Sequence, residues 1–138
     1  MVEVIYSHTF PYAYRGLAQA PMLQIRLASP TPSQEQVDVD AFLDSGANYS
    51  LFDGQLADAI GLDLMAGRPR QYYSTTGAEV DARCHRVLLQ RPGLGTFALE
   101  VGFSTSRIAR NLLGRDFFSL VQIGFREQRL EFYIEPTP

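Results

Sequence analysis

The sequence predicts a mostly β fold with one or two short helices. Apolar and polar residues alternate with a period of two in several separate segments, and this pattern is typical of half-buried strands. Gly, Pro, Asn or Ser residues bound these segments, as is usual where strands end in turns. Because the chain has 138 residues and domains most often hold about 100 to 150, we expect one hydrophobic core.

The alternation is clearest in four segments, and the cluster Pro30-Thr31-Pro32-Ser33 separates the first from the second. Their apolar positions are Leu23, Ile25 and Leu27; Val37, Val39, Ala41 and Leu43; Phe97, Leu99, Val101 and Phe103; and Leu130, Phe132 and Ile134. Asp38 and Asp40 lie on the opposite face of the second segment, which we interpret as solvated rather than as a cation site. Asp44 follows with the same parity, where this strand ends.

Short helices are expected at two places. The first begins at about Asp53, a suitable N-cap, and ends near Gly61, because glycine commonly occupies the position after a helix. The second begins near Arg115 or Asp116 and precedes another strand. The apolar residues are Leu56, Ala57 and Ile60 in the first helix, Phe117, Phe118 and Leu120 in the second, and Val121, Ile123 and Phe125 in the strand. Residues 1–20 are interpreted as an N-terminal arm or an added edge strand, and residues 21–138 as the domain.

The composition excludes several classes of function. Apolar residues make up 46% and charged residues 20% of the chain, as in soluble globular proteins. A net charge of -3 provides no basic field for nucleic acid or for anionic lipid. The chain shows neither a signal peptide nor an apolar run of about 20 residues, so we expect a cytoplasmic protein that does not enter membranes.

The cysteine and histidine content argues against a metal cofactor. Cys84 is the single cysteine, so an internal disulfide is excluded, and we expect Cys84 to pack as a small hydrophobe. Its neighbour His85 would face the opposite side of a strand, and His8 is the other histidine. These residues do not form the ligand set that a metal site requires, and no cofactor is expected.

The segment around Asp44 carries the clearest chemical signal. An apolar strand delivers Asp44 directly into the turn Ser45-Gly46-Ala47. A carboxylate in this position needs hydration or hydrogen bonds, because burying it unpaired is costly. Ser45 offers a hydroxyl, and Gly46 permits a positive φ and a close approach of its N–H to a carboxylate. Because Asp-Ser-Gly is also common in ordinary turns, this segment alone does not decide the function.

A second segment, Asn111-Leu112-Leu113-Gly114-Arg115-Asp116, places two apolar residues and a glycine ahead of the second helix. Taken together, Asp44-Ser45-Gly46-Ala47 and Leu112-Leu113-Gly114-Arg115-Asp116 resemble the retropepsin-like aspartic proteases, which include retroviral proteases and bacterial relatives. The resemblance extends from about Met22 to Ile134, and the combination of the motifs is more specific than either motif alone.

This resemblance implies a closed or barrel-like acid-protease fold with Asp44, Ser45 and Gly46 in the catalytic loop. The residues that would support this loop are Leu112, Leu113, Gly114 and Arg115. Two carboxylates about 3 Å apart cannot both ionise, so they share a proton and together activate a water molecule. Since the chain has a single Asp-Ser/Thr-Gly motif, the resemblance implies a homodimer with one Asp44 from each copy.

The stretch from Gln71 to Val80 resembles the flap hairpin that closes over the peptide in this family. Strand-like residues on both sides of a glycine favour a hairpin, although Thr-Gly turns also occur in ordinary surface hairpins. The resemblance implies that a peptide or protein substrate binds between the catalytic loop and the flap tip. The residues implied in binding are Ala47, Asn48, Thr76, Gly77 and Ala78.

The chain departs from the retroviral pattern at Asn48. Retroviral members have an acidic residue four positions after the catalytic aspartate, and it pairs with the arginine that corresponds to Arg115, a partly buried donor. Asparagine cannot form this ion pair. Arg115 is therefore expected to bond Asn48 more weakly, or to reach Asp53 or Asp116.

Two other interpretations compete with an aspartic endopeptidase. A retropepsin-like module without catalysis could dimerise or bind peptides, and Asn48 leaves room for this alternative. An ordinary β-sandwich binding domain would make Asp44 and Gly114 coincidental. The presence of both Asp44 and Gly46 favours the enzyme.

Overall fold

The computed structural model describes residues 3, 5–16, 18–31, 35–74 and 76–137. This part of the chain is mostly β, as predicted. The strands are β1 (His8–Pro11), β2 (Ala13–Arg15), β3 (Ala18–Ala20), β4 (Met22–Ala28), β5 (Gln36–Leu43), β6 (Leu51–Asp53), β7 (Arg68–Tyr73), β8 (Glu79–Arg91), β9 (Gly95–Ser104), β10 (Asn111–Leu113), β11 (Val121–Arg126) and β12 (Glu131–Pro136). The helices are α1 (Gln55–Ala59) and α2 (Arg115–Phe118), with the 3₁₀ turns η1 (Leu64–Ala66) and η2 (Glu127–Arg129). The predicted break before β5 includes Pro32 and Ser33, which lie outside the described residues.

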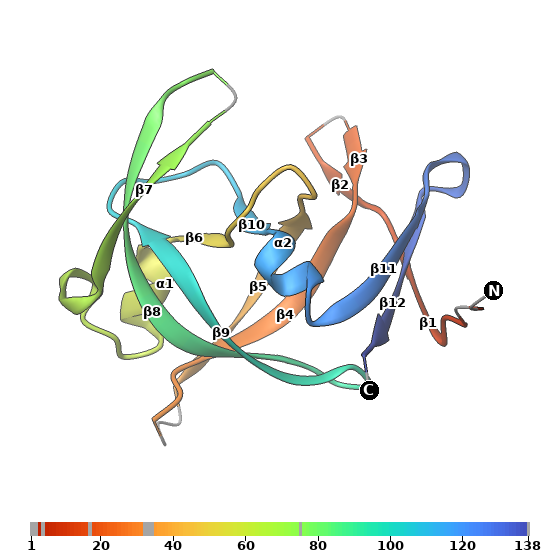
Figure 1. The fold of residues 1–138 in the computed structure, drawn as a ribbon, viewed down its shortest axis with the longest axis horizontal. Coiled ribbons are helices and arrows are strands. Elements are labelled where there is room, and N and C mark those ends of the chain that lie inside the picture. Colours follow the sequence, from red (N-terminus) through yellow and green to blue (C-terminus); the bar gives the residue numbers. More distant parts are fainter. Residues whose placement is uncertain (1–2, 4, 17, 32–34, 75, 138) are drawn as a thin grey trace.

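The largest sheet has seven strands in the order β4-β5-β10-β6-β9-β8-β7. Because β4 also pairs with β8, this sheet closes on itself around the core (Figure 1). The long strands β8 and β9 pair antiparallel over most of their length. The closed sheet that the sequence predicted is therefore present.

The predicted apolar face of β4 and β5 forms the centre of this core. Leu23 and Ile25 are each 1% exposed, and Ile25 lies opposite Val39 in the antiparallel register. Asp38 and Asp40, on the other face, are exposed as predicted. The period-two pattern therefore predicted correctly which face of β5 is buried in the core.

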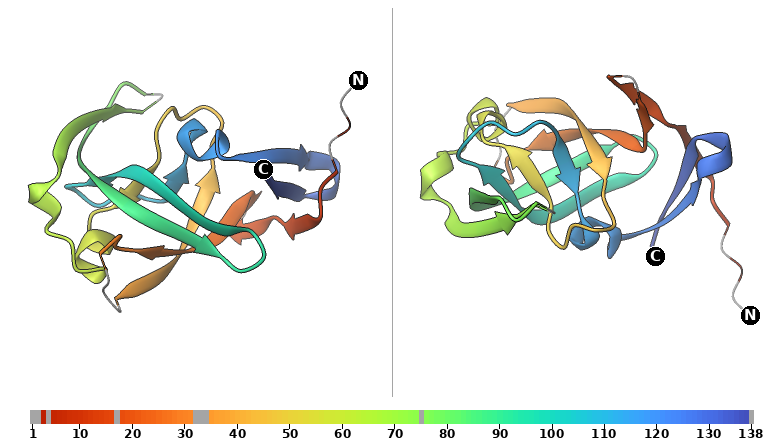
Figure 2. Two further views of the ribbon diagram at one scale, coloured as in Figure 1. Left: turned by 60° about the horizontal axis from the view of Figure 1, so that its bottom comes forward. Right: turned by 90° about the horizontal axis from the view of Figure 1, so that it is seen from above.

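A separate three-stranded sheet has the order β1-β12-β11 and lies beside the closed sheet (Figure 2). Phe10 in β1 lies opposite Phe132 in β12, and their rings stack with centroids 5.1 Å apart. Tyr12 is buried, and its hydroxyl donates to Glu127 Oε2 at 2.7 Å. β1 is thus an edge strand packed on the C-terminal hairpin, whereas β2 and β3 pair with each other.

The first predicted helix is present, but its N-cap differs from the expectation. α1 is capped by Gly54 rather than by Asp53. The Asp53 carboxylate still accepts a hydrogen bond from the Gln55 N–H at 2.9 Å, so Asp53 satisfies a helix N–H from one position further out. Gly61 follows the helix with φ 79, a left-handed conformation that favours glycine at this place.

The C-terminal part also follows the prediction closely. α2 begins at Arg115 and buries Phe117 completely. The last strand begins at Glu131 rather than at Leu130, because Leu130 adopts a left-handed backbone with φ 51 in the turn before it. Among the described residues, no helix is long and apolar enough to cross a membrane.

Candidate active site

Asp44 follows the last residue of β5, where this strand lies beside β10. The two strands are parallel, with Leu43 opposite Leu113. The Asp44 N–H donates to the Leu113 carbonyl at 2.9 Å, and Asp44 is half-buried. The two sequence motifs, which are far apart along the chain, therefore meet in the fold.

The turn after Asp44 folds back onto its carboxylate. The Gly46 N–H donates to Asp44 Oδ1 at 2.9 Å, and the Ala47 N–H donates to the Asp44 carbonyl at 3.2 Å. Gly46 does not use the positive φ that glycine permits. A Cβ at this position would lie 3.2 Å from Asp44 Oδ1, so glycine serves the close approach of the N–H to the carboxylate.

Gly114 lies directly against the loop formed by residues 44–50. A Cβ on Gly114 would lie 2.7 Å from the Ala47 carbonyl oxygen and 3.0 Å from the Tyr49 carbonyl carbon. Because real Cβ atoms essentially never approach backbone this closely, only glycine fits here without moving the loop. The Gly114 N–H also donates to Ser50 Oγ at 3.0 Å. Glycine is thus required at position 114 because the loop of the first motif packs against it.

Ser50 and Asp116 form a polar contact under this loop. The sequence alone did not predict this pair. Ser50 is fully buried. Its N–H donates to Asp116 Oδ2 at 2.9 Å, and its hydroxyl donates to Asp116 Oδ1 at 2.7 Å. Asp116 also accepts from the Phe117 N–H at 2.8 Å. The carboxylate therefore ties the end of the loop to the first turn of α2.

Arg115 contacts the loop through its backbone. Its N–H donates to the Ala47 carbonyl at 2.8 Å, but its side chain is exposed rather than partly buried. Within the described residues, the guanidinium forms no hydrogen bond or ion pair with Asn48, Asp53 or Asp116. The two aspartates accept backbone N–H groups instead. Asn48 is exposed as well.

The expected flap is a hairpin of β7 and β8 that rises from the closed sheet on the side where β5 ends (Figure 1). At its tip the Ser74 N–H donates to the Ala78 carbonyl at 2.9 Å, and the Gly77 N–H donates to the Ser74 carbonyl at 2.9 Å. Gly77 has φ 84, a backbone conformation that favours glycine. Thr76, Gly77 and Ala78 are exposed, and Thr75 lies outside the described residues.

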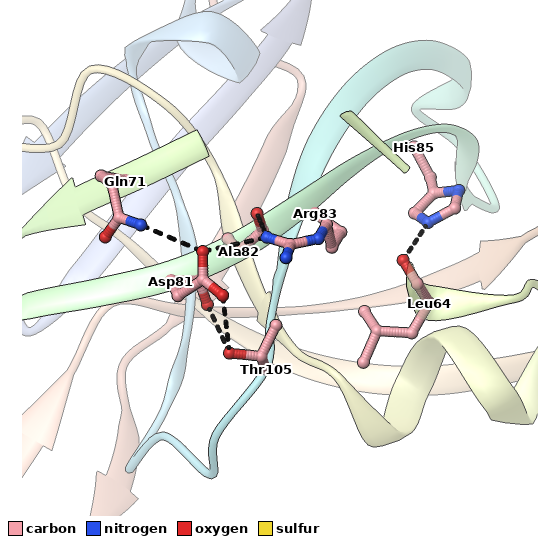
Figure 3. Close-up of polar contacts among 7 residues, drawn as sticks. All are labelled: Leu64, Gln71, Asp81, Ala82, Arg83, His85 and Thr105. Atoms are coloured by element: carbon pink, nitrogen blue, oxygen red, sulfur yellow. Dashed lines mark hydrogen bonds and ion pairs between the residues drawn. The ribbon is translucent and has the colours of Figure 1, made fainter. Parts of the chain in front are cut away.

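Asp81 holds the root of the flap (Figure 3). Gln71 Nε2 and Arg83 Nη1 donate to Asp81 Oδ1 at 3.0 Å and 2.9 Å. The Thr105 N–H donates to the Asp81 carbonyl at 2.9 Å. These bonds join both flap strands to the residue that follows β9.

Cys84 and His85 contribute to packing and to hydrogen bonding within the fold. Cys84 is 4% exposed, which confirms the expected packing, and burial raises the pKa of its thiol. His85 Nε2 lies 2.9 Å from the Leu64 carbonyl oxygen (Figure 3), and the ring meets Phe103 edge-on. In the part of the chain that the structure describes, no group of three His, Cys, Asp or Glu residues could hold a metal ion.

The family model described as aspartyl protease matches residues 33–117, which is more than half of the chain. The matched range includes the Asp44 turn, the flap and the segment at Gly114. The comparison with curated proteins finds no significant sequence match.

Solved structures share the fold. A retropepsin-like aspartic protease from Rickettsia conorii is 15% identical with a TM-score of 0.63, and the match covers 98% of this chain and 100% of that chain. EIAV protease complexed with the inhibitor HBY-793 is 17% identical with a TM-score of 0.55, over 78% of this chain and 92% of that chain. The retroviral protease-like domain of Ddi1 from Leishmania major is 17% identical with a TM-score of 0.55, over 86% of this chain and 96% of that chain.

Proposed function

Because the chain belongs to the aspartyl protease family, we propose that it is an endopeptidase that cleaves peptide bonds at a pair of Asp44 carboxylates. The observation that carries this proposal is the position of Asp44. It ends an apolar strand, it is fixed by the Leu113 carbonyl, and its carboxylate accepts the Gly46 N–H. A half-buried carboxylate held in this way is oriented before any substrate arrives, which is what general acid–base chemistry needs.

The second carboxylate is assigned to Asp44 of another copy of the chain. Each chain has a single Asp-Ser-Gly motif, so a dyad built from this motif requires a symmetric homodimer. The active enzyme is therefore a dimer with its active site on the two-fold axis. Dissociation into single chains separates the carboxylates and abolishes activity.

The proposed chemistry follows from the repulsion between two close carboxylates. Two such groups about 3 Å apart cannot both ionise, so the pair retains one proton in an acidic medium. The charged member takes a proton from a water molecule as the water oxygen attacks the scissile carbonyl carbon. The protonated member donates a hydrogen bond to the oxyanion that develops. The C–N bond then breaks, and the leaving nitrogen takes up a proton from the dyad.

The substrate is an extended peptide held between the catalytic loop and the flap. Ala47 and Asn48 continue the loop beyond the catalytic turn, and Thr76, Gly77 and Ala78 form the exposed tip of the flap. Asn48 on the loop and Thr76 on the flap are exposed, and we assign to them the main-chain hydrogen bonds by which an extended chain binds. This binding mode recognises peptide backbone, and side-chain pockets add the selectivity.

The test measures cleavage of a peptide library by the purified chain from acidic to neutral pH, beside Asp44→Asn. We expect products from the wild type, with an optimum below neutrality, and a loss of kcat of at least about 10³-fold in the variant. The asparagine Oδ1 still accepts the Gly46 N–H, so circular dichroism and the oligomeric state stay unchanged. Equal cleavage by both proteins contradicts the proposal. Peptide binding without cleavage by the wild type favours the non-catalytic module.

A further inference from the structure

The inner side of the flap root contacts the loop that carries Asp44. In β7, Arg70 and Tyr72 are partly buried, whereas Gln71 and Tyr73 are exposed. This alternation is that of a strand with one face turned toward the body of the protein. Arg70 and Tyr72 therefore face the body of the protein beneath the flap.

Tyr72 reaches across β9 to the end of the catalytic loop. Its hydroxyl donates to the Ser50 carbonyl at 2.9 Å. The phenol passes over Gly102, where a Cβ would lie 2.4 Å from the Tyr72 oxygen, so this glycine leaves room for the contact. Burial raises the pKa of Tyr72 to about 12, and the hydroxyl keeps its proton as a donor at acidic and neutral pH.

Arg70 makes a second contact between the same two regions. Its guanidinium carbon lies 4.0 Å from the centroid of the Tyr49 ring, within the range of a cation–π interaction. Arg70 Nη2 also lies 3.6 Å from Glu100 Oε1 in β9. Arg70 and Tyr72, two positions apart in β7, thus contact the adjacent loop residues Tyr49 and Ser50.

Ser50 is fixed by groups outside the flap. Its N–H and hydroxyl donate to Asp116, its Oγ accepts from the Gly114 N–H, and its carbonyl accepts from the Gly102 N–H at 3.1 Å. Loss of the Tyr72 hydroxyl would leave all of these bonds in place. The loop therefore sets the position of the flap, and the flap does not set the position of the loop.

We propose that Tyr72 is a positioning residue that sets the flap above the Asp44 loop, so that the flap closes in register with the carboxylates. The effect on peptide cleavage rests on the proposed function, whereas the mechanical link does not. A flap already held in place loses less conformational freedom when it closes on a peptide, and this lowers the cost of binding. Tyr72 therefore acts on peptide affinity more than on the chemical step.

The kinetic test compares Tyr72→Phe with Tyr73→Phe. Both variants remove one hydroxyl from adjacent flap residues, but Tyr73 is 68% exposed and points away from the loop. We expect Tyr72→Phe to raise KM by at least about fivefold with kcat unchanged, because the variant loses the hydrogen bond to the Ser50 carbonyl and the hydroxyl's interaction with Arg70. Tyr73→Phe leaves both constants unchanged. An unchanged KM in Tyr72→Phe, or an equal rise in both variants, overturns the proposal.

Amide hydrogen exchange tests the link without relying on activity. In Tyr72→Phe we expect exchange at the Ser74 and Gly77 amides to accelerate about fivefold, because the flap opens more often, while the Asp44 and Gly102 amides keep their protection. Unchanged flap exchange overturns the link. Equal acceleration at all four amides also overturns it, since that indicates general destabilisation. Faster flap exchange in a chain that cleaves no peptide supports the link and contradicts the proposed function.

Discussion

The loop of residues 44–50 and the tip of the flap face the same proposed substrate, but they are held very differently. The loop donates hydrogen bonds to elements far away in the sequence, from the Asp44 N–H to the Leu113 carbonyl and from the Ser50 N–H to Asp116. The hydrogen bonds at the flap tip join residues that are two to four positions apart, between Ser74 and Thr76, Gly77 or Ala78. The loop is thus connected to the core of the fold, whereas the flap tip, among the residues that the structure describes, bonds only within itself.

This difference matches the tasks that the two regions would have in catalysis. Carboxylates that activate water must be oriented in advance, because a misplaced group loses most of its effect. A flap must open to admit a peptide, and elements that open are drawn from the less stable parts of a protein. The comparison can be tested by loosening the loop, by straining the flap alone, and by removing an exposed side chain that bonds to neither.

Loosening the loop has the largest expected effect on stability. Asp116→Ala leaves the N–H and hydroxyl of the fully buried Ser50 without their acceptor, and we expect a loss of about 2 to 3 kcal/mol in the free energy of unfolding. Urea denaturation measures this change. Asp116→Asn is the matched control, because it retains one acceptor oxygen and is expected to lose about half as much. A midpoint for Asp116→Ala equal to that of the wild type would show that this bond does not hold the loop.

Straining the flap alone has a smaller and local effect. Gly77→Ala places a side chain on a backbone with φ 84, which costs about 1 kcal/mol. Because the flap tip bonds only to itself among the described residues, we expect faster hydrogen exchange at the Ser74 amide through a local opening whose rate depends little on urea. Exchange at the Ser74 amide with the same urea dependence as global unfolding would contradict the comparison, because it would mean that the flap and the core unfold together.

The smallest effect is expected at Arg115. Its side chain is exposed and, in the described part of the chain, without a charged partner, so Arg115→Ala is expected to change the free energy of unfolding by less than about 0.5 kcal/mol. Thermal unfolding of the single chain at low concentration measures this. A loss several times larger at low concentration would contradict this expectation, whereas a larger loss that appears only at high concentration would reveal a partner that Arg115 gains on association.

The sequence predicted what depends on local pattern. The alternation at Leu23 and Ile25 identified a core strand, and the apolar run before Asp44 placed that residue at the end of a strand. The helix after Gly114 was also placed correctly. These features follow from periodicity and from the local preferences of glycine and turn residues.

The sequence did not predict contacts that depend on how distant segments pack. Ser50 and Asp116 are 66 positions apart, and no spacing rule connects a serine in a loop with a carboxylate in a helix turn. The resemblance instead drew attention to Arg115, whose side chain is exposed. Tyr72 lies within the predicted flap hairpin, but its bond to the Ser50 carbonyl depends on β9 passing between them at Gly102. Register and sheet order decide such contacts, and both are properties of the whole fold.

The most direct test of the dyad mixes wild-type chains with increasing amounts of Asp44→Asn chains and measures peptide cleavage. Subunit exchange is first confirmed with two differently tagged populations. If each active site needs one Asp44 from each of two chains, mixed dimers are inactive, and activity at constant total protein falls with the square of the wild-type fraction. If activity instead falls in simple proportion to the wild-type fraction, one chain supplies a complete site, and the assignment of the second carboxylate to a partner chain is wrong.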